Sequence, residues 1–235
     1  MSVSYILLAH NEVETIEDEL RSIHEAVIRR LPGSELIVAE DGSVDGTRAA
    51  IERLRDALSL RIIGGEARKG YARAMIDAVS AATQPFAFVS DGGFKHDAAE
   101  FWALWELRDS YDLVIGWKKE RHDALYRRAL TSGLNLALRM WFRVPLHDAD
   151  SGFRLYNQRV VQEIIRPGLT FRGFVSAEVV LRSMAAGLRC GEVPITYRQR
   201  VGQSRGLPVR KIPRATLRLL LDLWRLKRLI ARRAA

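Results

Sequence analysis

The sequence is poor in cysteine and in long hydrophobic runs. Its one cysteine, Cys190, excludes an internal disulfide and a zinc site built from several cysteines, which fits a reducing compartment. The longest stretch without a charged residue runs only from Ala78 to Ser90, too short to cross a membrane as a helix. The apolar run from Val3 to Ala9 has no basic leader, so it does not look like a signal peptide. These absences predict a cytoplasmic protein.

Positive charge is distributed unevenly along the chain. The 235 residues carry a formal net charge of +9. From Arg205 to the C-terminus there are ten Lys or Arg and one acid, Asp222, whereas the remainder holds 27 basic and 27 acidic residues. A nucleic-acid-binding domain would need a basic face on the fold itself, so we expect no nucleic-acid partner. The basic C-terminal segment instead predicts contact with an anionic surface such as that of a membrane.

The remaining composition is that of a globular α/β protein. Hydrophobic residues make up 48% and charged residues 28% of a chain long enough for one large domain. Short apolar runs alternate with amphipathic stretches, which predicts a Rossmann-like, mostly parallel sheet flanked by helices and doubly wound in its first half. We expect strands at 3–9, 36–39, 60–63, 85–90, 113–116, just after the loop 147–154, and at 192–197. Pro194 places the last strand at a sheet edge.

Polar residues follow several of these strands. Glu40 and Asp41 end the run Leu36–Ala39 and begin a turn in which Asp45 or Thr47 is suited to cap the next helix. In an open α/β sheet, ligands bind at the carboxyl ends of the strands, and carboxylates there can accept hydrogen bonds from a base or ribose. The alternative is an acidic turn that only caps a helix.

Two other features also have two interpretations. The glycine-rich basic turn 64–70 precedes a helix, so it is either an anion site or a surface turn, and it lacks the spacing of a P-loop. His96 and His147 are either metal ligands or, as is more common, surface or hydrogen-bonded histidines.

The C-terminal segment 208–235 is predicted as a linker followed by a helix from about Arg214. Leu217, Leu220, Leu221 and Trp224 fall on one face of this helix, and arginines fall on another. A basic amphipathic helix of this kind is typical of a segment that lies in a membrane interface. The alternatives are a helix packed on its own domain or on a second copy of the chain, which leaves a homo-oligomer open.

Five segments in order resemble the motifs of one family. They are 9–12 (AHNE, similar to P-x-Y-N-E), 40–47 (EDGSVDGT, similar to D-D-G-S-x-D-G-T), 68–72 (RKGYA), 148–154 (DADSGFR, similar to D-x-x-S-G-F-R) and 192–205 (EVP, then R-x-G-x-S-R). The chain thus resembles the family 2 inverting glycosyltransferases of GT-A fold, especially dolichol-phosphate mannose synthases and bacterial polyprenyl-phosphate glycosyltransferases. The resemblance implies a GT-A domain over 1–207, with a nucleotide-binding half to about 117 and an acceptor half from 118.

The resemblance also implies residue roles. Asp91 would match the last Asp of the D-x-D motif, which holds Mg²⁺ or Mn²⁺ on the diphosphate, and Asp91, Asp148 and Asp150 are the candidate catalytic residues, with Glu178 a weaker one. The implied nucleotide-binding residues are Ala9, His10, Glu12, Glu40, Asp41, Arg68 and Lys69. The implied phosphate- or acceptor-binding residues are Arg127, Arg128, Arg200, Ser204 and Arg205.

The sequence departs from the family pattern at the metal motif. Val89 stands where the first Asp of D-x-D is expected, His10 replaces a Tyr, and Gly93 stands where Gln is common. We expect a transferase at the inner face of the cell membrane that moves a sugar from a nucleotide-sugar donor to a polyprenyl phosphate. The alternatives are an enzyme that elongates lipopolysaccharide or exopolysaccharide glycans, or a non-catalytic nucleotide-sugar-binding protein.

Overall fold

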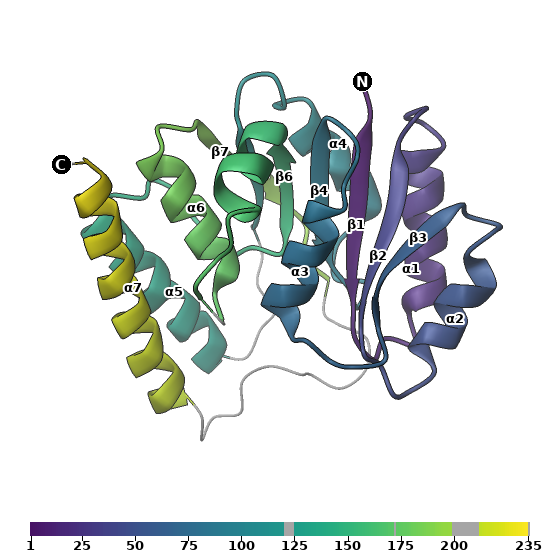
Figure 1. Ribbon diagram of the computed structural model, residues 1–235, viewed down its shortest axis with the longest axis horizontal. Helices are drawn as coiled ribbons and strands as arrows, with labels where there is room; N and C mark the ends of the chain where they lie inside the picture. The colour runs from purple at the N-terminus through teal and green to yellow at the C-terminus, as the bar shows by residue number, and fades with distance from the viewer. Residues whose placement is uncertain (120–124, 172, 199–211, 235) are drawn as a thin grey trace.

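The computed structural model describes residues 1–119, 125–171, 173–198 and 212–234. Its described part contains one seven-stranded sheet with the order β3-β2-β1-β4-β6-β5-β7 (Figure 1). Neighbouring strands are parallel except at β6, which is antiparallel to both β4 and β5. The strands are β1 (Val3–Ala9), β2 (Glu35–Asp41), β3 (Leu60–Gly65), β4 (Phe86–Asp91), β5 (Leu113–Lys118), β6 (Phe153–Asn157) and β7 (Cys190–Ile195). The predicted mostly parallel sheet is confirmed, and β7 lies at an edge as Pro194 indicates.

Both faces of the sheet are covered, which explains why its strands read as continuous apolar runs. Every residue of β1 is buried, and its side chains alternate between two cores. Ile6 and Leu8 join the core beneath α3, whereas Tyr5 and Leu7 join the core beneath α1. Figure 1 shows α3 and α6 on the near face of the sheet and α1 behind it.

The helices follow the predicted order with some differences at their ends. They are α1 (Ile16–Ile23), α2 (Thr47–Leu54), α3 (Tyr71–Ser80), α4 (Phe101–Trp105), α5 (Leu125–Phe142), α6 (Val175–Ala185) and α7 (Ile212–Ala234), with short helical segments η1 (His24–Ile28), η2 (Ala98–Glu100) and η3 (Val160–Ile165). The first helical stretch changes from α to π geometry after Ile23.

The second half of the sheet is not a continuation of the parallel winding. β5 does not pair with β4, because β6 inserts between them and runs in the opposite direction. This insertion brings the start of β6 beside the carboxyl end of β4, where Ser90 pairs with Phe153. The loop that precedes β6 is thereby placed at the same sheet edge as the first strands' carboxyl ends.

Helix α7 packs on the domain with one face only. Leu223 and Leu226 are buried in the same core as Leu134 and Leu138 of α5, and Figure 1 shows α7 beside α5 at the end of the molecule. The residues of its other apolar stripe are exposed, with Leu217 at 61% and Trp224 at 52%. Within the described residues, no helix is both long enough and apolar enough to span a membrane.

Candidate functional site

The carboxyl ends of β1, β2 and β4 meet at one open pocket of about 660 Å³, solvent space included. Such a pocket at the carboxyl ends of parallel strands is the common ligand site of an open α/β sheet. Its lining includes six of the predicted site residues and two polar residues that were not predicted, Tyr71 and Lys95. The six are Ala9, His10, Glu12, Asp41, Arg68 and Asp91.

The turns after β1 and β2 are locked together by motif residues. The backbone N–H of Asn11 donates to Ser43 Oγ at 2.8 Å, and the backbone N–H of Glu12 donates to Thr47 Oγ1 at 2.6 Å. Asn11 adopts a left-handed φ of 55°, which lets its side-chain oxygen accept from Val44 N. This part of the 40–47 motif therefore holds one wall of the pocket in place. The N-cap residue of α2 is Gly46 rather than the predicted Asp45 or Thr47, although Asp45 Oδ1 accepts the backbone N–H of Thr47 at 3.0 Å.

Asp41 fastens the glycine-rich turn to the end of β2. Its Oδ1 accepts the backbone N–H groups of Lys69 at 2.6 Å and Gly70 at 3.0 Å, and Arg68 Nε lies 3.8 Å from its Oδ2. Gly42 permits this close approach, because a Cβ at that position would lie 2.6 Å from Arg68 N. The turn is thus fixed so that Arg68 faces the pocket.

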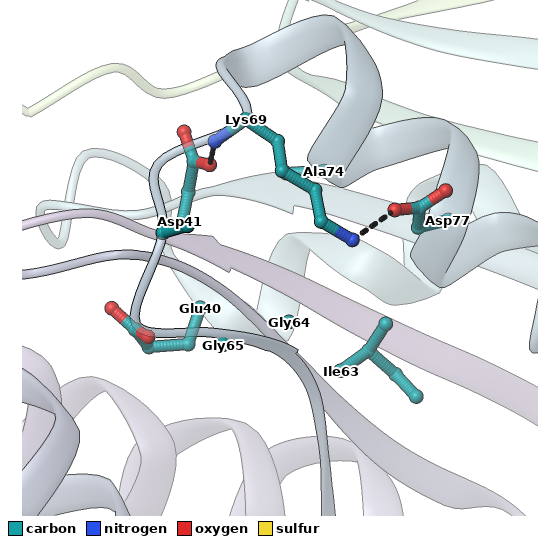
Figure 2. A pocket seen from close by; sticks show the side chains of 9 residues that line it. Glu40, Asp41, Ile63, Gly64, Gly65, Lys69, Ala74 and Asp77 are labelled. Atoms are coloured by element: carbon teal, nitrogen blue, oxygen red, sulfur yellow. Dashed lines mark hydrogen bonds and ion pairs between the residues drawn. The ribbon is translucent and has the colours of Figure 1, made fainter.

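Glu40 and Lys69 do not line this pocket. Glu40 points to the other side of the strand, where its carboxylate accepts Ser43 N and pairs with Arg48. Figure 2 shows the Lys69 side chain turned along α3, with its ammonium 2.9 Å from Asp77 Oδ2. Both residues line a smaller neighbouring cavity instead. The resemblance implies that both residues contact the nucleotide, but neither of them lines the main pocket.

Asp91 lies at the centre of a charged cluster. Tyr71 Oη donates to its Oδ1 at 2.8 Å, Lys95 Nζ lies 3.6 Å from its Oδ2, and Arg154 donates to Tyr71 Oη at 3.0 Å. Burial by itself would raise the pKa of Asp91, but the charges of Lys95 and Arg154 outweigh that effect and hold the pKa below its usual range. Asp91 is therefore ionised at neutral pH.

The metal motif is placed differently from the sequence expectation. Val89 is fully buried in the core with Ile6 and Ala87, so a carboxylate at that position would not reach the pocket. β4 ends at Asp91, and Asp91 and Gly92 line the pocket, with Gly93 next in the turn. We therefore place the missing acid of an Asp-x-Asp pattern at Gly93, two residues after Asp91, rather than at Val89. The backbone N–H groups of Gly93 and Phe94 both donate to the buried Glu19.

The loop before β6 lies against Asp91. Asp91 N donates to Gly152 O at 2.9 Å, and a Cβ on Gly152 would fall 2.0 Å from the Asp91 carboxylate. Burial raises the pKa of Asp150 to about 7, with Arg154 opposing the shift and Asp148 adding to it. Asp150 is therefore close enough to interact with the charges of both Asp91 and Asp148, although neither Asp148 nor Asp150 lines the pocket. Glu178 is fully buried and bonds to Thr170, Phe171 and Arg182, which gives it a structural role.

The described residues do not fit a divalent metal well. No group of three or more His, Cys, Asp or Glu side chains among them is arranged to hold a metal ion. Both Asp91 oxygens are already approached by Tyr71 and Lys95, so a dication there would face the charges of Lys95 and Arg154.

The two histidines considered as metal ligands contact other side chains. His96 is buried against Phe153, and burial lowers its pKa to about 3. His147 pairs with Glu192 and stacks on Trp117.

Several predicted residues cannot be placed. Arg200, Ser204 and Arg205 lie outside the described residues, and Arg127 and Arg128 fall in α5 with side chains outside the described part. Of the residues that were missed, Arg154 carries a visible signal, since a lone charge between Phe153 and Leu155 in a strand needs a partner. Lys95 carries a weaker signal, its spacing of four residues from Asp91.

Residues 4–165 match the family described as "Glycosyl transferase family 2". The chain belongs to this family. Its members are glycosyltransferases, and the structure gives this one the GT-A type of fold. The predicted membership of family 2 and the predicted GT-A fold are thereby confirmed.

Similar proteins include two enzymes that are named for lipid-phosphate acceptors. Dodecaprenyl-phosphate galacturonate synthase of Rhizobium johnstonii is 27% identical over 95% of this family 2 chain and 65% of that protein, so the chain spans less than two thirds of this relative. Dolichyl-phosphate hexose transferase of Haloferax volcanii is 26% identical over 86% of each chain.

Solved structures share the fold at low identity. Glucosyl-3-phosphoglycerate synthase from Mycobacterium tuberculosis, in complex with Mn²⁺, UDP and glucosyl-3-phosphoglycerate, superposes with a TM-score of 0.71 at 20% identity. The superposition covers 96% of this chain and 79% of that one.

Proposed function

We propose that this family 2 glycosyltransferase moves a sugar, with inversion, from a nucleotide-sugar donor to a polyprenyl phosphate or a similar membrane-associated acceptor. The observation that carries the donor assignment is the pocket at the carboxyl ends of β1, β2 and β4. It combines the carboxylates Glu12, Asp41 and Asp91 with the cations Arg68 and Lys95. Carboxylates suit the hydroxyl and N–H donors of a nucleoside, and cations suit a diphosphate.

The transfer itself requires little proton movement if the acceptor is a phosphate. An acceptor oxygen forms a bond to the anomeric carbon while the bond from that carbon to the diphosphate oxygen breaks, and the electron pair leaves with the nucleoside diphosphate. A phosphate oxygen is already anionic, so it needs no general base. Cationic groups near the leaving diphosphate stabilise the charge that develops on it.

The exposed stripe of α7 supports a membrane-associated acceptor. Trp224 and Leu217 stand with Leu220 and Leu221 on the face of α7 that the domain leaves uncovered. Arg228 lies over the Trp224 ring at 4.6 Å, so a positive charge borders the apolar residues. Apolar side chains bordered by cations favour an anionic lipid surface, and such contact would bring the pocket to a lipid-linked acceptor. The names of the two relatives with lipid-phosphate acceptors point in the same direction.

A transfer assay tests the acceptor class. The enzyme is incubated with a panel of UDP-, GDP-, CDP- and TDP-sugars and with one of three acceptors, a polyprenyl phosphate in anionic vesicles, phosphoglyceric acid, or a glycan with free hydroxyls. We expect a sugar–polyprenyl phosphate product of inverted configuration. Transfer only to phosphoglyceric acid or only to the glycan would refute the lipid acceptor and leave the family assignment intact.

A vesicle flotation assay tests the membrane contact separately. Trp224→Asp with Leu220→Asp should release the protein from anionic vesicles and leave nucleotide binding unchanged. Val44→Asp is the matched control, because Val44 is 90% exposed in the turn between β2 and α2, remote in the fold from α7. Undiminished flotation of the α7 variant would show that α7 is not the anchor. Substitution is preferable to deletion, since removing α7 would also uncover core residues such as Leu138.

A further inference from the structure

Lys95 occupies the place in the pocket where a diphosphate needs positive charge. It lines the pocket together with Asp91 and Gly92, and its side chain is only 18% exposed. Its ammonium group lies 3.6 Å from Asp91 Oδ2, on the turn that leaves β4. Among the described residues Asp91 is the one ion-pair partner of Lys95, whose charge also acts on the buried Glu19. A lysine has three N–H donors, so the pair leaves donors for phosphate oxygens.

The same turn lacks the second carboxylate that a metal would use. Gly93 has no side chain and adopts a φ of +92°, and its N–H is held by Glu19. Mg²⁺ is usually bound by one or two carboxylates with the substrate phosphates, but here the single pocket carboxylate at this turn is already paired with a cation.

Arg154 reinforces the positive charge from behind Asp91. Its guanidinium is fully buried and donates to Tyr71 Oη, while Nε and Nη1 find no hydrogen-bond partner among the described residues. A buried guanidinium with unpaired donors makes an anion nearby more favourable. Asp150, half-buried beside it, offsets part of this charge at neutral pH.

We infer that Lys95, held by Asp91 and supported by Arg154, takes the role of a divalent cation on the donor diphosphate, so that this enzyme binds nucleoside diphosphates without metal. The inference rests on the proposed function, since it assumes a nucleotide-sugar donor. Lys95 would donate to the phosphate oxygens and stabilise the negative charge of the leaving group. Asp91 would then be a positioning residue for Lys95 rather than a metal ligand.

Calorimetric titration of the full chain tests the inference. UDP, GDP, CDP and TDP are titrated in EDTA and then in Mg²⁺ or Mn²⁺. We expect one of them to bind in EDTA within about threefold of its affinity in metal. Lys95→Met should weaken binding in EDTA about 10- to 100-fold, as loss of charge-assisted hydrogen bonds does, and Lys95→Arg should restore most of it. Arg29→Met is the control, because Arg29 is an exposed cation just after η1 and is paired with Glu25.

The outcomes separate the two proposals. Binding that appears only with metal would overturn the role of Lys95 and leave the nucleotide-sugar donor in place. Metal-free binding that survives Lys95→Met would also overturn it, and would move the diphosphate to other cations such as Arg68. If none of the nucleotides binds under any condition, the proposed donor fails and the inference fails with it. Circular dichroism of each variant checks that the fold is retained.

Discussion

Replacing Glu19 by glutamine should change how the stability of this protein depends on pH. Glu19 lies on α1 and is only 3% exposed, and its Oε2 accepts the backbone N–H groups of Gly93 at 3.1 Å and Phe94 at 3.0 Å. It therefore fixes the turn that carries Gly93 and Lys95. Glutamine keeps an acceptor oxygen for these bonds but removes the ionisable group.

The size of the effect follows from the pKa of Glu19. Burial raises it from 4.5 to about 7, although the hydrogen bond from Phe94 and the charge of Lys95 oppose the shift. Between these values the folded protein holds a proton that the unfolded chain has lost, so the contribution of Glu19 to stability is greatest below about pH 4.5 and is lost as the pH rises through 7. A shift of this size corresponds to about 3 kcal/mol at pH 8.

Urea unfolding of the wild type and of Glu19→Gln at pH 4, 6 and 8 measures this contribution of Glu19 to the unfolding free energy. Relative to wild type, Glu19→Gln should gain about 3 kcal/mol of unfolding free energy between pH 4 and pH 8. Glu25→Gln is the control, since Glu25 is exposed on η1 and should give no such gain. Parallel pH profiles for wild type and Glu19→Gln would refute the reasoning, because they would mean that Glu19 is ionised equally in the folded and unfolded states.

Three further predictions concern the pocket. Asp41→Ala should lower the unfolding free energy by about 2–4 kcal/mol in a urea titration and weaken nucleotide binding at least about tenfold, because it strands the N–H groups of Lys69 and Gly70; unchanged stability would contradict this. Asp91→Asn should slow sugar transfer at least about 100-fold in a product assay while the fold persists, and undiminished turnover would remove Asp91 from the site. With a hydroxyl acceptor, the rate should rise as the pH passes through about 7 and Asp150→Asn should abolish that rise, whereas a polyprenyl phosphate should show no such dependence on Asp150.

Local pattern was sufficient to predict the strands and their order along the chain. The run 36–39 is apolar at every position and the run 3–9 at every position except Ser4, because the strands of this sheet are buried on both faces. The motif segments were also visible, since turns need particular residues such as Gly42 and Asp45. These signals identified the family before any contact was known.

The direction of individual side chains could not be predicted in the same way. Glu40 and Asp41 are adjacent in the sequence, yet only Asp41 faces the main pocket, because consecutive residues of a strand point to opposite faces. The Lys69 side chain points along α3 to Asp77. Its neighbour Arg68 lines the pocket instead. Val89 points to the same face of β4 as Asp91 but lies deeper along the strand, in the core with Ile6, so the missing acid is placed after the strand, at Gly93.

The sequence by itself determined the α/β class, the sites of the turns and the excess of positive charge near the C-terminus, because all of these depend on residues close together in the chain. Which residues form the charged cluster around Asp91 was decided only by the tertiary structure. β6 inserts antiparallel between β4 and β5, and this pairing carries Arg154 to Tyr71 and Gly152 to Asp91. Strand register between distant segments is set by packing of the whole sheet, so no local pattern could place Arg154 and Lys95 around one carboxylate.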